Sequence, residues 1–274
     1  MNELIEAFLR EDIGIADITT NSIVSAHQVS LASIIAKEDG VIAGHIFARD
    51  IFKSLDDAIN YEEIKKEGEF VRKGDILADI KGKTRAILTG ERVALNILQR
   101  LSGIATQTSK YVSAVEGTGV KILDTRKTTP GLRKMEKYAV RIGGGYNHRF
   151  DLSEMALVKE NHIEAAGSIK DALRRLRETS DIFVEVEVKN MDELVEALGE
   201  KVDRIMLDNW DIENIRRAVD VVGKRVPIEA SGNMTVERAR EVAKTGIDLI
   251  SVGAITHSFK ALDMTLLVKR QKRR

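Results

Sequence analysis

The stretch DIFVEVEVKNMDELVEALGEKVDRIMLDN, residues 181–209, decides the fold class of the chain. It holds two short runs rich in apolar and β-branched residues, 181–190 and 203–209, which are separated by a helical pattern at 191–200. Strand, loop and helix repeat in this manner from about residue 118 onwards. Such alternation predicts a parallel sheet with helices outside it, and about six units in about 150 residues favour a TIM-like α/β barrel. The remaining strand-like runs are VKILDTR (120–126), MALVKEN (155–161), VPIEASGN (226–233) and LISVGAIT (249–256).

The first hundred residues have a different rhythm. Residues 1–10 are expected to form an amphipathic helix, and from about 29 to 87 short apolar runs separated by glycines are typical of antiparallel strands. Residues 89–116 predict a helix with a wide apolar face and a kink or break at Ser102-Gly103. The predicted domains are residues 1–104, an α/β domain with a mostly antiparallel sheet, and residues 105–274, an α/β barrel whose last helix packs back on the first domain.

The composition is that of an ordinary globular protein. The 274 residues carry 43 basic and 43 acidic side chains, a balance that argues against nucleic-acid binding as the main role. Without cysteine, a disulfide framework, a cysteine-ligated metal site and thiolate catalysis are excluded. No apolar run approaches the roughly 20 residues that span a bilayer, and the acidic, amphipathic start of the chain is not the pattern of a signal peptide. We therefore expect a cytoplasmic protein without nucleic-acid or membrane partners.

Polar residues follow nearly every strand-like run of the second half. In parallel α/β barrels the carboxyl ends of the strands converge on one mouth, where sites are built. Solvent exposure explains charges at one strand end, but cations and carboxylates at six consecutive ends suggest a site for a phosphorylated ligand and a metal. These residues are Asp124, Arg126 and Lys127; Lys159, Glu160 and Asn161; Glu185, Glu187 and Lys189; Asp208 and Asn209; Glu229, Ser231 and Gly232; and Ser251 and Gly253.

Two carboxylates of the central run have alternative interpretations. Glu185 and Glu187 lie two residues apart, so in a strand they point to the same face. A carboxylate directed into a barrel is costly unless it is paired or bound to a metal. One interpretation is an internal salt bridge to lysines of neighbouring strands, and the other is a ligand for sugar hydroxyls or for Mg²⁺.

The segment 124–149 is rich in groups that bind anions. Five basic residues fall within 126–137, and the glycines at 143–145 let the backbone approach a ligand closely. Arg126 and Arg149 are each able to bind a carboxylate in a bidentate manner, which lysine is not.

A phosphate site is expected at the last two strand ends, 229–233 and 249–256. Small residues leave room there, and Thr235 is placed to cap a following helix, whose free amides favour an anion. The chain has no P-loop, no dinucleotide-binding glycine fingerprint, no H-E-x-x-H and no arrangement of serine and histidine that suggests a nucleophilic triad. The basic end, KRQKRR at 269–274, is expected to be a frayed helix terminus.

Seven motifs occur in order with intact spacing, and together they resemble the quinolinate phosphoribosyltransferase family, also called nicotinate-nucleotide pyrophosphorylases. The resemblance runs from about residue 11 to residue 256, almost the whole chain. The motifs are EDIGIADITT (11–20), GERVALNILQRLSGIAT (90–106), DTRKTTPGLRKMEKYAVRIGGGYNHR (124–149), ALVKENHI (156–163), EVEV (185–188), IMLDN (205–209) and EASGN (229–233).

The resemblance implies a pentosyltransferase of NAD biosynthesis. It would join quinolinate to phosphoribosyl pyrophosphate, giving nicotinate mononucleotide, pyrophosphate and CO₂, with Mg²⁺ as cofactor. It also implies an open-faced N-terminal domain, a C-terminal barrel and a homodimer in which one subunit's N-terminal domain closes the other's barrel mouth. Assembly beyond the dimer stays open. The residues agree with such substrates, because two polyanions need clustered cations in a protein that stays neutral overall.

The resemblance also implies a role for each matched position. The quinolinate carboxylates would be bound by Arg126, His148, Arg149 and Lys159, together with the partner subunit's Arg92. Lys127 would lie between the substrate carboxylate and the pyrophosphate, with Thr125 in the same substrate-binding run.

Further matched positions concern the phosphoribosyl group. Glu187 and Asp208 would hold the ribose hydroxyls and Mg²⁺, directly or through water, and with Lys127 and Lys159 they form the expected catalytic set. The 5′-phosphate would be bound by Ser231, Gly232, Asn233, Val252, Gly253 and Ala254.

Other functions stay open at this point. A related pyrophosphorylase acting on nicotinate would need fewer cations, because that acid has one carboxylate. A Schiff-base lyase would use Lys159 as an amine nucleophile. A barrel retained as a binding module would bind ligand without turnover.

Overall fold

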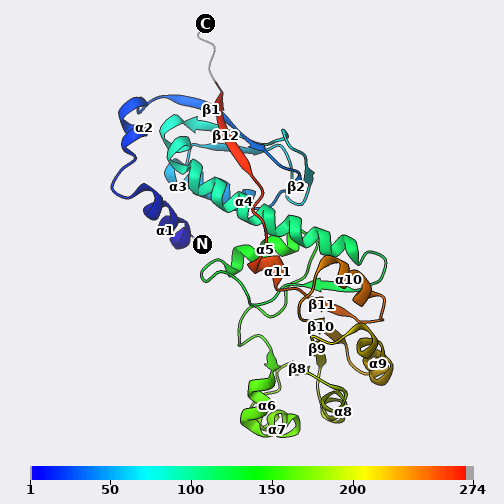
Figure 1. Ribbon diagram of the computed structural model, residues 1–274. Helices are drawn as coiled ribbons and strands as arrows, with labels where there is room; N and C mark the ends of the chain where they lie inside the picture. Colours follow the sequence, from blue (N-terminus) through cyan, green and yellow to red (C-terminus); the bar gives the residue numbers. More distant parts are fainter. Residues whose placement is uncertain (1, 270–274) are drawn as a thin grey trace. The chain divides into compact units, whose positions relative to one another are not determined.

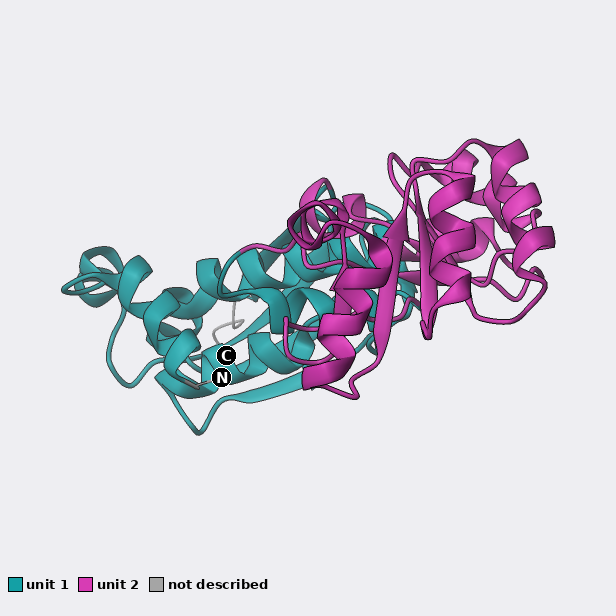
Figure 2. Cartoon of the chain, turned by 90° about the horizontal axis from the view of Figure 1, so that it is seen from below, with its two compact units in different colours: residues 1–107, 130–144, 259–274 teal, residues 108–129, 145–258 magenta. Residues whose placement is uncertain are grey.

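The computed structural model of the chain describes residues 2–269. The chain forms two compact units, shown in teal and magenta in Figure 2. The first comprises residues 1–107, 130–144 and 259–274, and the second comprises residues 108–129 and 145–258. The first unit thus includes three segments that the predicted division at 104/105 assigned to the barrel, residues 105–107, 130–144 and 259–274.

The first unit is built on a four-stranded antiparallel sheet with the order β12-β1-β5-β3, of which β1, β5 and β3 come from the glycine-punctuated runs at 29–87. Alternate residues of β1 (Val29–Ala36), among them Ala32 and Ile34, are completely buried. The other elements are β3 (Asn60–Glu63), β5 (Ile76–Lys83), β12 (Met264–Lys269), the pair β2 (Gly40–Val41) and β4 (Phe70–Val71), and the helices α1 (Asn2–Ile13), α2 (Ile18–Ile23), α3 (His45–Leu55) and α5 (Arg133–Ile142) (Figure 1).

The long helix α4 (Thr84–Ala114) begins in the first unit and is not broken at Ser102-Gly103. The expected break was wrong, and Gly103 serves close packing. A Cβ atom at Gly103 would lie 2.3 Å from the carbonyl oxygen of Lys260, so that only glycine admits the C-terminal segment at this distance.

The chain's last described element is a strand, β12, and the predicted final helix was wrong. In residues 264–269 burial alternates, with Met264 and Leu266 buried and Leu267 exposed, which is the period of a half-buried strand. β12 pairs antiparallel with β1, from Leu31 opposite Lys269 to Ala36 opposite Met264. Residues 270–274 of the basic segment lie outside the described residues.

The second unit contains six parallel strands in the order β6-β11-β10-β9-β8-β7, which confirms the predicted parallel sheet. The edge strands β6 and β7, which closure of a barrel would bring together, do not pair within residues 2–269. The strands are β6 (Lys121–Leu123), β7 (Ala156–Val158), β8 (Val184–Val188), β9 (Arg204–Asp208), β10 (Ile228–Ser231) and β11 (Leu249–Ser251).

A helix follows each of the last five strands of this sheet, and side chains before several of these helices fix where they begin. Ser168, Asn190, Asp211 and Thr235 each accept a hydrogen bond from a backbone N–H of the first turn, as predicted for Thr235. The helices are α6 (Glu160–Ala166), α7 (Ile169–Thr179), α8 (Met191–Gly199), α9 (Ile212–Val222), α10 (Val236–Ala243) and α11 (Ala254–His257). In the described chain, no helix combines the length and apolar character needed to cross a membrane.

Candidate active site

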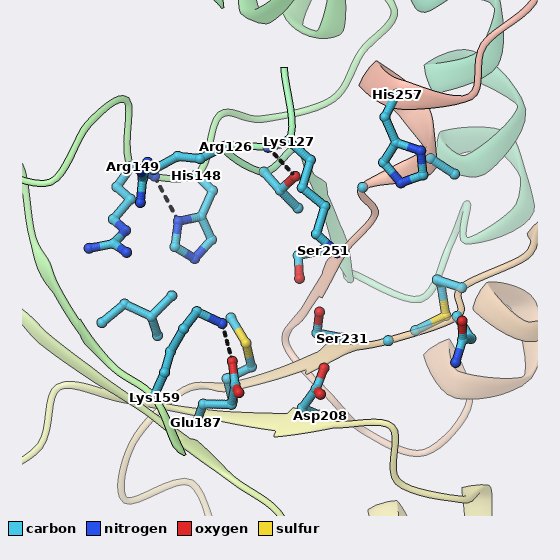
Figure 3. Close-up of a pocket in the computed structure, with 18 of the residues that line it drawn as sticks. Arg126, Lys127, His148, Arg149, Lys159, Glu187, Asp208, Ser231, Ser251 and His257 are labelled. Carbon is cyan, nitrogen blue, oxygen red and sulfur yellow. Dashed lines mark hydrogen bonds and ion pairs between the residues drawn. The ribbon is translucent and has the colours of Figure 1, made fainter. Parts of the chain in front are cut away.

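A pocket of about 570 Å³ opens at the carboxyl ends of the parallel strands (Figure 3). Lys159 follows β7, Asp208 ends β9 and Ser231 ends β10, so the sheet itself brings together residues far apart in the sequence. The pocket gathers all but two of the residues predicted for the site. Those that line it are Thr125, Arg126, Lys127, His148, Arg149, Lys159, Glu187, Asp208, Ser231, Gly232, Asn233, Gly253 and Ala254.

Two predicted residues, Val252 and Arg92, do not line the pocket. Val252 is 1% exposed, and its backbone N–H donates to the carbonyl oxygen of Leu123 in the neighbouring strand, so this amide serves the sheet. Arg92 is an exposed residue of α4 and belongs to the first unit.

The guanidinium groups of Arg126 and Arg149 both line one end of the pocket, and their positive charges repel one another. Arg149 is largely buried, and its Nη1 donates to the carbonyl oxygen of Met155 over 3.0 Å. Burial lowers the pKa of Arg149, and the positive charge of Arg126 lowers it further. Bringing two cations together in a poorly hydrated site costs free energy, which a ligand with negative charge relieves. This end of the pocket therefore favours an anion, and a dianion more strongly.

Lys159 forms an ion pair with Glu187, whose side chain is mostly buried (Figure 3). The lysine follows β7, and the glutamate lies on the adjacent strand β8. Of the two sequence interpretations for Glu187, the salt bridge to a lysine of a neighbouring strand is thus present. Lys159 therefore already has a carboxylate partner inside the pocket.

Asp208 is oriented by two amide side chains, those of Asn209 and Asn233. Asn233 Nδ2 donates to Asn209 Oδ1 over 3.0 Å, and Asn209 Nδ2 donates to Asp208 Oδ2 over 2.8 Å. Both asparagines have left-handed backbone conformations, with φ values of 60° at Asn209 and 44° at Asn233. Gly232 has a φ of 93°, and a Cβ there would lie 2.2 Å from Asn209 Oδ1.

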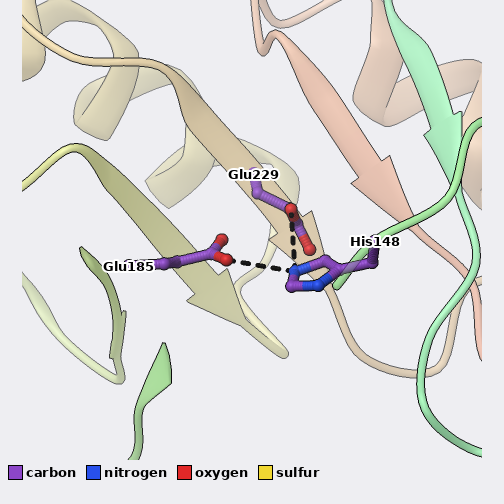
Figure 4. Close-up of side chains that lie close together, drawn as sticks. All are labelled: His148, Glu185 and Glu229. Carbon is purple, nitrogen blue, oxygen red and sulfur yellow. Dashed lines mark hydrogen bonds and ion pairs between the residues drawn. The ribbon is translucent and has the colours of Figure 1, made fainter. Parts of the chain in front are cut away.

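Behind the pocket, His148 contacts a buried ionic cluster (Figure 4). Its Nε2 lies 3.0 Å from Glu185 Oε2 and 3.6 Å from Glu229 Oε2. Arg204 Nη1 donates to Glu229 Oε2 over 3.0 Å and lies 3.7 Å from Glu185 Oε2. Burial raises the pKa of both carboxyl groups, and the charge of Glu185 raises that of Glu229 further. Glu185 therefore pairs with a histidine and an arginine rather than with a lysine.

The pocket contains further residues that the sequence analysis did not include in its site. His257 lies at the opposite end from Arg149 in Figure 3, one turn after Gly253. A Cβ at Gly253 would lie 3.1 Å from His257 Nε2 and 3.1 Å from Lys127 Cδ, so the absence of a side chain there keeps this end open. The short helix after the last strand was the signal that could have indicated His257. The others are Leu157, Met206 and Met234, and the pocket is also lined by Thr235 and Ser251, which the strand-end pattern indicated.

A strand-end pocket with a cationic end, two carboxylates and a glycine-lined end defines a class: an α/β-barrel-like enzyme for anionic, phosphorylated ligands. Two protein-family models match the chain and identify the class more closely. The model of the quinolinate phosphoribosyl transferase C-terminal domain matches residues 104–267, and that of the N-terminal domain matches residues 17–102.

Individual relatives agree with the family models. A protein of Bacillus subtilis (strain 168) named probable nicotinate-nucleotide pyrophosphorylase [carboxylating] is 42% identical, over 97% of this chain and 92% of its own. A crystal structure of NadC from Streptococcus pyogenes has a TM-score of 0.93 at 42% identity, covering 98% of this chain and 97% of the other. That of nicotinate-nucleotide pyrophosphorylase from Ehrlichia chaffeensis has a TM-score of 0.94 at 39% identity, covering 98% of both. The chain belongs to the quinolinate phosphoribosyltransferase family.

Proposed function

We propose that this chain transfers the phosphoribosyl group of phosphoribosyl pyrophosphate to quinolinate and releases CO₂, giving nicotinate mononucleotide and pyrophosphate. The observation that carries the substrate assignment is the pair of guanidinium groups, Arg126 and Arg149, whose mutual repulsion a pyridine dicarboxylate relieves better than a monocarboxylate. The activity is the one that the names of the relatives in Bacillus subtilis and other organisms state.

The two ends of the pocket divide the substrates between them. Quinolinate fits the end with Arg126, Arg149 and Lys159, near Thr125 and Lys127. The 5′-phosphate fits the other end, where small residues leave room for a phosphate beside the backbone. The residues of that end are Ser231, Gly232, Asn233, Gly253 and Ala254.

The reaction needs positioning and electrostatics rather than a protein nucleophile. The ring nitrogen of quinolinate donates its electron pair to C1 of the ribose while the C1–O bond to pyrophosphate breaks, with the electron pair leaving on the oxygen. Glu187 and Asp208 are the carboxylates of the pocket, placed to stabilise positive charge at C1, and Lys127 is placed to stabilise the leaving anion. The carboxylate next to the cationic nitrogen then leaves as CO₂, and the ring carbon takes up a proton.

We propose Mg²⁺ as cofactor, held by Glu187 and Asp208. The donor set fits, because Mg²⁺ in proteins is bound by one or two carboxylates together with substrate phosphates and water. When bound, the ion supplies charge neutralisation for the leaving pyrophosphate. Glu187 would hold the ion in place of its present contact with Lys159, whose amine would then be available to a substrate carboxylate.

We further propose a homodimer in the cytoplasm, in which the partner subunit's Arg92 completes the quinolinate end. Supporting this, Arg92 is exposed in the first unit, while the pocket consists wholly of second-unit residues. The family resemblance at GERV (90–93) is the reason to expect a shared site.

Turnover of quinolinate and of nicotinate, assayed in parallel with phosphoribosyl pyrophosphate, tests the substrate. Quinolinate is expected to react and nicotinate to be inert; preference for nicotinate would overturn the proposal. Sodium borohydride tests the Schiff-base hypothesis. A lyase would join its carbonyl substrate to Lys159 as an imine, and borohydride would reduce that imine to a stable amine. Binding of both substrates without any product would instead identify a binding module.

A further inference from the structure

The ring nitrogens of His148 are both engaged within the protein. The backbone N–H of Arg149 donates to His148 Nδ1 over 2.8 Å, and Nε2 lies 3.0 Å from Glu185 Oε2. A backbone N–H can only donate, so Nδ1 must accept and carries no proton. Nε2 therefore carries the single ring proton of a neutral imidazole, and this N–H donates a hydrogen bond to Glu185.

The backbone of this segment is held from a second direction. The N–H of His148 donates to Asp124 Oδ1 over 2.8 Å, and Asp124 is completely buried at the end of β6. His148 is thus fixed by its own amide, by Nδ1 and by Nε2, with Arg149 as the next residue. Any rotation of the imidazole breaks the contact that Nδ1 makes with the amide of Arg149.

We propose that His148 is a positioning residue for Arg149 rather than a ligand of the substrate, and that Glu185, Glu229 and Arg204 hold its ring in the required tautomer and plane. The proposal rests on the proposed function, which makes Arg149 the contact for a quinolinate carboxylate. It differs from the role that the family resemblance implied, because the one ring N–H of this imidazole is donated to Glu185 and Nδ1 accepts from Arg149.

The cluster is better explained as a support than as a metal site. The ligand atoms of His148, Glu185 and Glu229 lie within 4.8 Å of one another, close enough to hold a metal ion. Arg204 already supplies a cation to both carboxylates, at 3.0 Å and 3.7 Å. Both glutamates are completely buried, so a divalent ion there would bury its charge next to the guanidinium group of Arg204.

The charges around the cluster come from several elements. Glu185 stands on β8, Arg204 on β9 and Glu229 on β10, with Lys159 and Arg149 contributing positive charge from beyond β7 and from the loop. Arg204 supplies a cation to both glutamates, and the Nε2–H of His148 donates a hydrogen bond to Glu185 without the ring itself becoming charged. The arrangement therefore needs a hydrogen-bond donor at this position and not a second cation.

Nitrogen NMR of the protein labelled with ¹⁵N-histidine reads the tautomer directly. The chain has 5 histidines, and His148 is assigned from the signal lost in His148→Gln. We expect an unprotonated Nδ1 and a protonated Nε2 at neutral pH, both before and after addition of quinolinate. A doubly protonated ring, or one that becomes doubly protonated when quinolinate binds, would overturn the proposal. This readout requires the fold but no turnover.

Kinetics separate positioning from general support of the fold. Glu185→Leu removes the acceptor for Nε2–H and is expected to raise KM for quinolinate about tenfold, while KM for phosphoribosyl pyrophosphate changes less than about twofold. Glu185→Gln keeps an acceptor oxygen and is expected to restore most of the quinolinate affinity. Ile205→Val, which removes a buried methylene from the same sheet, is the matched control and is expected to leave both KM values unchanged.

Equal effects of Glu185→Leu on both substrates, or no rescue by Glu185→Gln, would refute the positioning role. Should Glu185→Leu fail to fold, Glu229→Gln replaces it: we expect an unchanged His148 tautomer, and a protonated Nδ1 would count against the proposal. An inactive wild-type protein with the expected tautomer would refute the proposed function and leave the orientation of His148 established.

Discussion

Replacing Glu185 by glutamine is expected to change how the free energy of unfolding depends on pH, and burial of Glu185 decides the sign of this change. Burial raises the pKa of Glu185 from the ordinary value of 4.5 to about 7. The folded protein therefore retains a proton that the unfolded chain loses above about pH 4.5. The stability from this proton is fully present below about pH 4.5 and is lost as the pH rises to about 7. For one proton and this difference in pKa, the loss is about 3 kcal/mol.

Urea denaturation of the wild type and Glu185→Gln between about pH 5 and about pH 8 measures this effect. Glutamine keeps the shape of the side chain and does not titrate. The free energy of unfolding of the variant, relative to that of the wild type, should therefore rise by about 2 kcal/mol from the lower to the upper end of this pH range. The exposed Glu213→Gln is the control and should show a constant difference. A difference between the wild type and Glu185→Gln that stays constant, or that moves in favour of the wild type as the pH rises, would refute the assignment of a raised pKa.

Three further predictions test packing, the phosphate end and the shared site. Gly103→Ala should cost about 1–3 kcal/mol in a thermal or urea unfolding experiment, because the new methyl group meets the carbonyl of Lys260; unchanged stability would contradict the close approach. Gly253→Ala should raise KM for phosphoribosyl pyrophosphate about tenfold in steady-state kinetics and leave the melting temperature nearly unchanged; a selective effect on quinolinate would contradict the division of the pocket. The Arg92→Ala and Lys159→Ala proteins are each expected to be inactive. Mixed in equal amounts, with subunit exchange demonstrated, they should recover about a quarter of wild-type activity, and no recovery would contradict a site shared between subunits.

The strand-end chemistry could be predicted because it depends on local pattern. Apolar runs alternating with helical patterns indicate parallel strands, and the residues that follow such runs must meet at one edge. Lys159, Glu187 and Asp208 were therefore identified without knowledge of their neighbours. The family resemblance added Arg92 and the role of each matched residue, which spacing alone did not assign.

Features that depend on distant contacts were missed or misassigned. Gly103 resembles a helix breaker in sequence, and only the C-terminal segment packed against it explains the glycine. Arg204 begins its strand and resembles an ordinary surface residue in sequence, yet it pairs with two buried glutamates across the sheet. Val252 was grouped with its neighbours by sequence, but its amide belongs to the ladder with β6.

Release of CO₂ from quinolinate labelled in the carboxyl group next to the ring nitrogen tests the proposed reaction most directly. Purified protein is incubated with Mg²⁺ and phosphoribosyl pyrophosphate, and labelled CO₂ and nicotinate mononucleotide are measured together. We predict equal amounts of the two products, and none when either substrate is omitted. Decarboxylation without phosphoribosyl pyrophosphate, or no product from quinolinate under conditions in which both substrates bind, would contradict the proposed function.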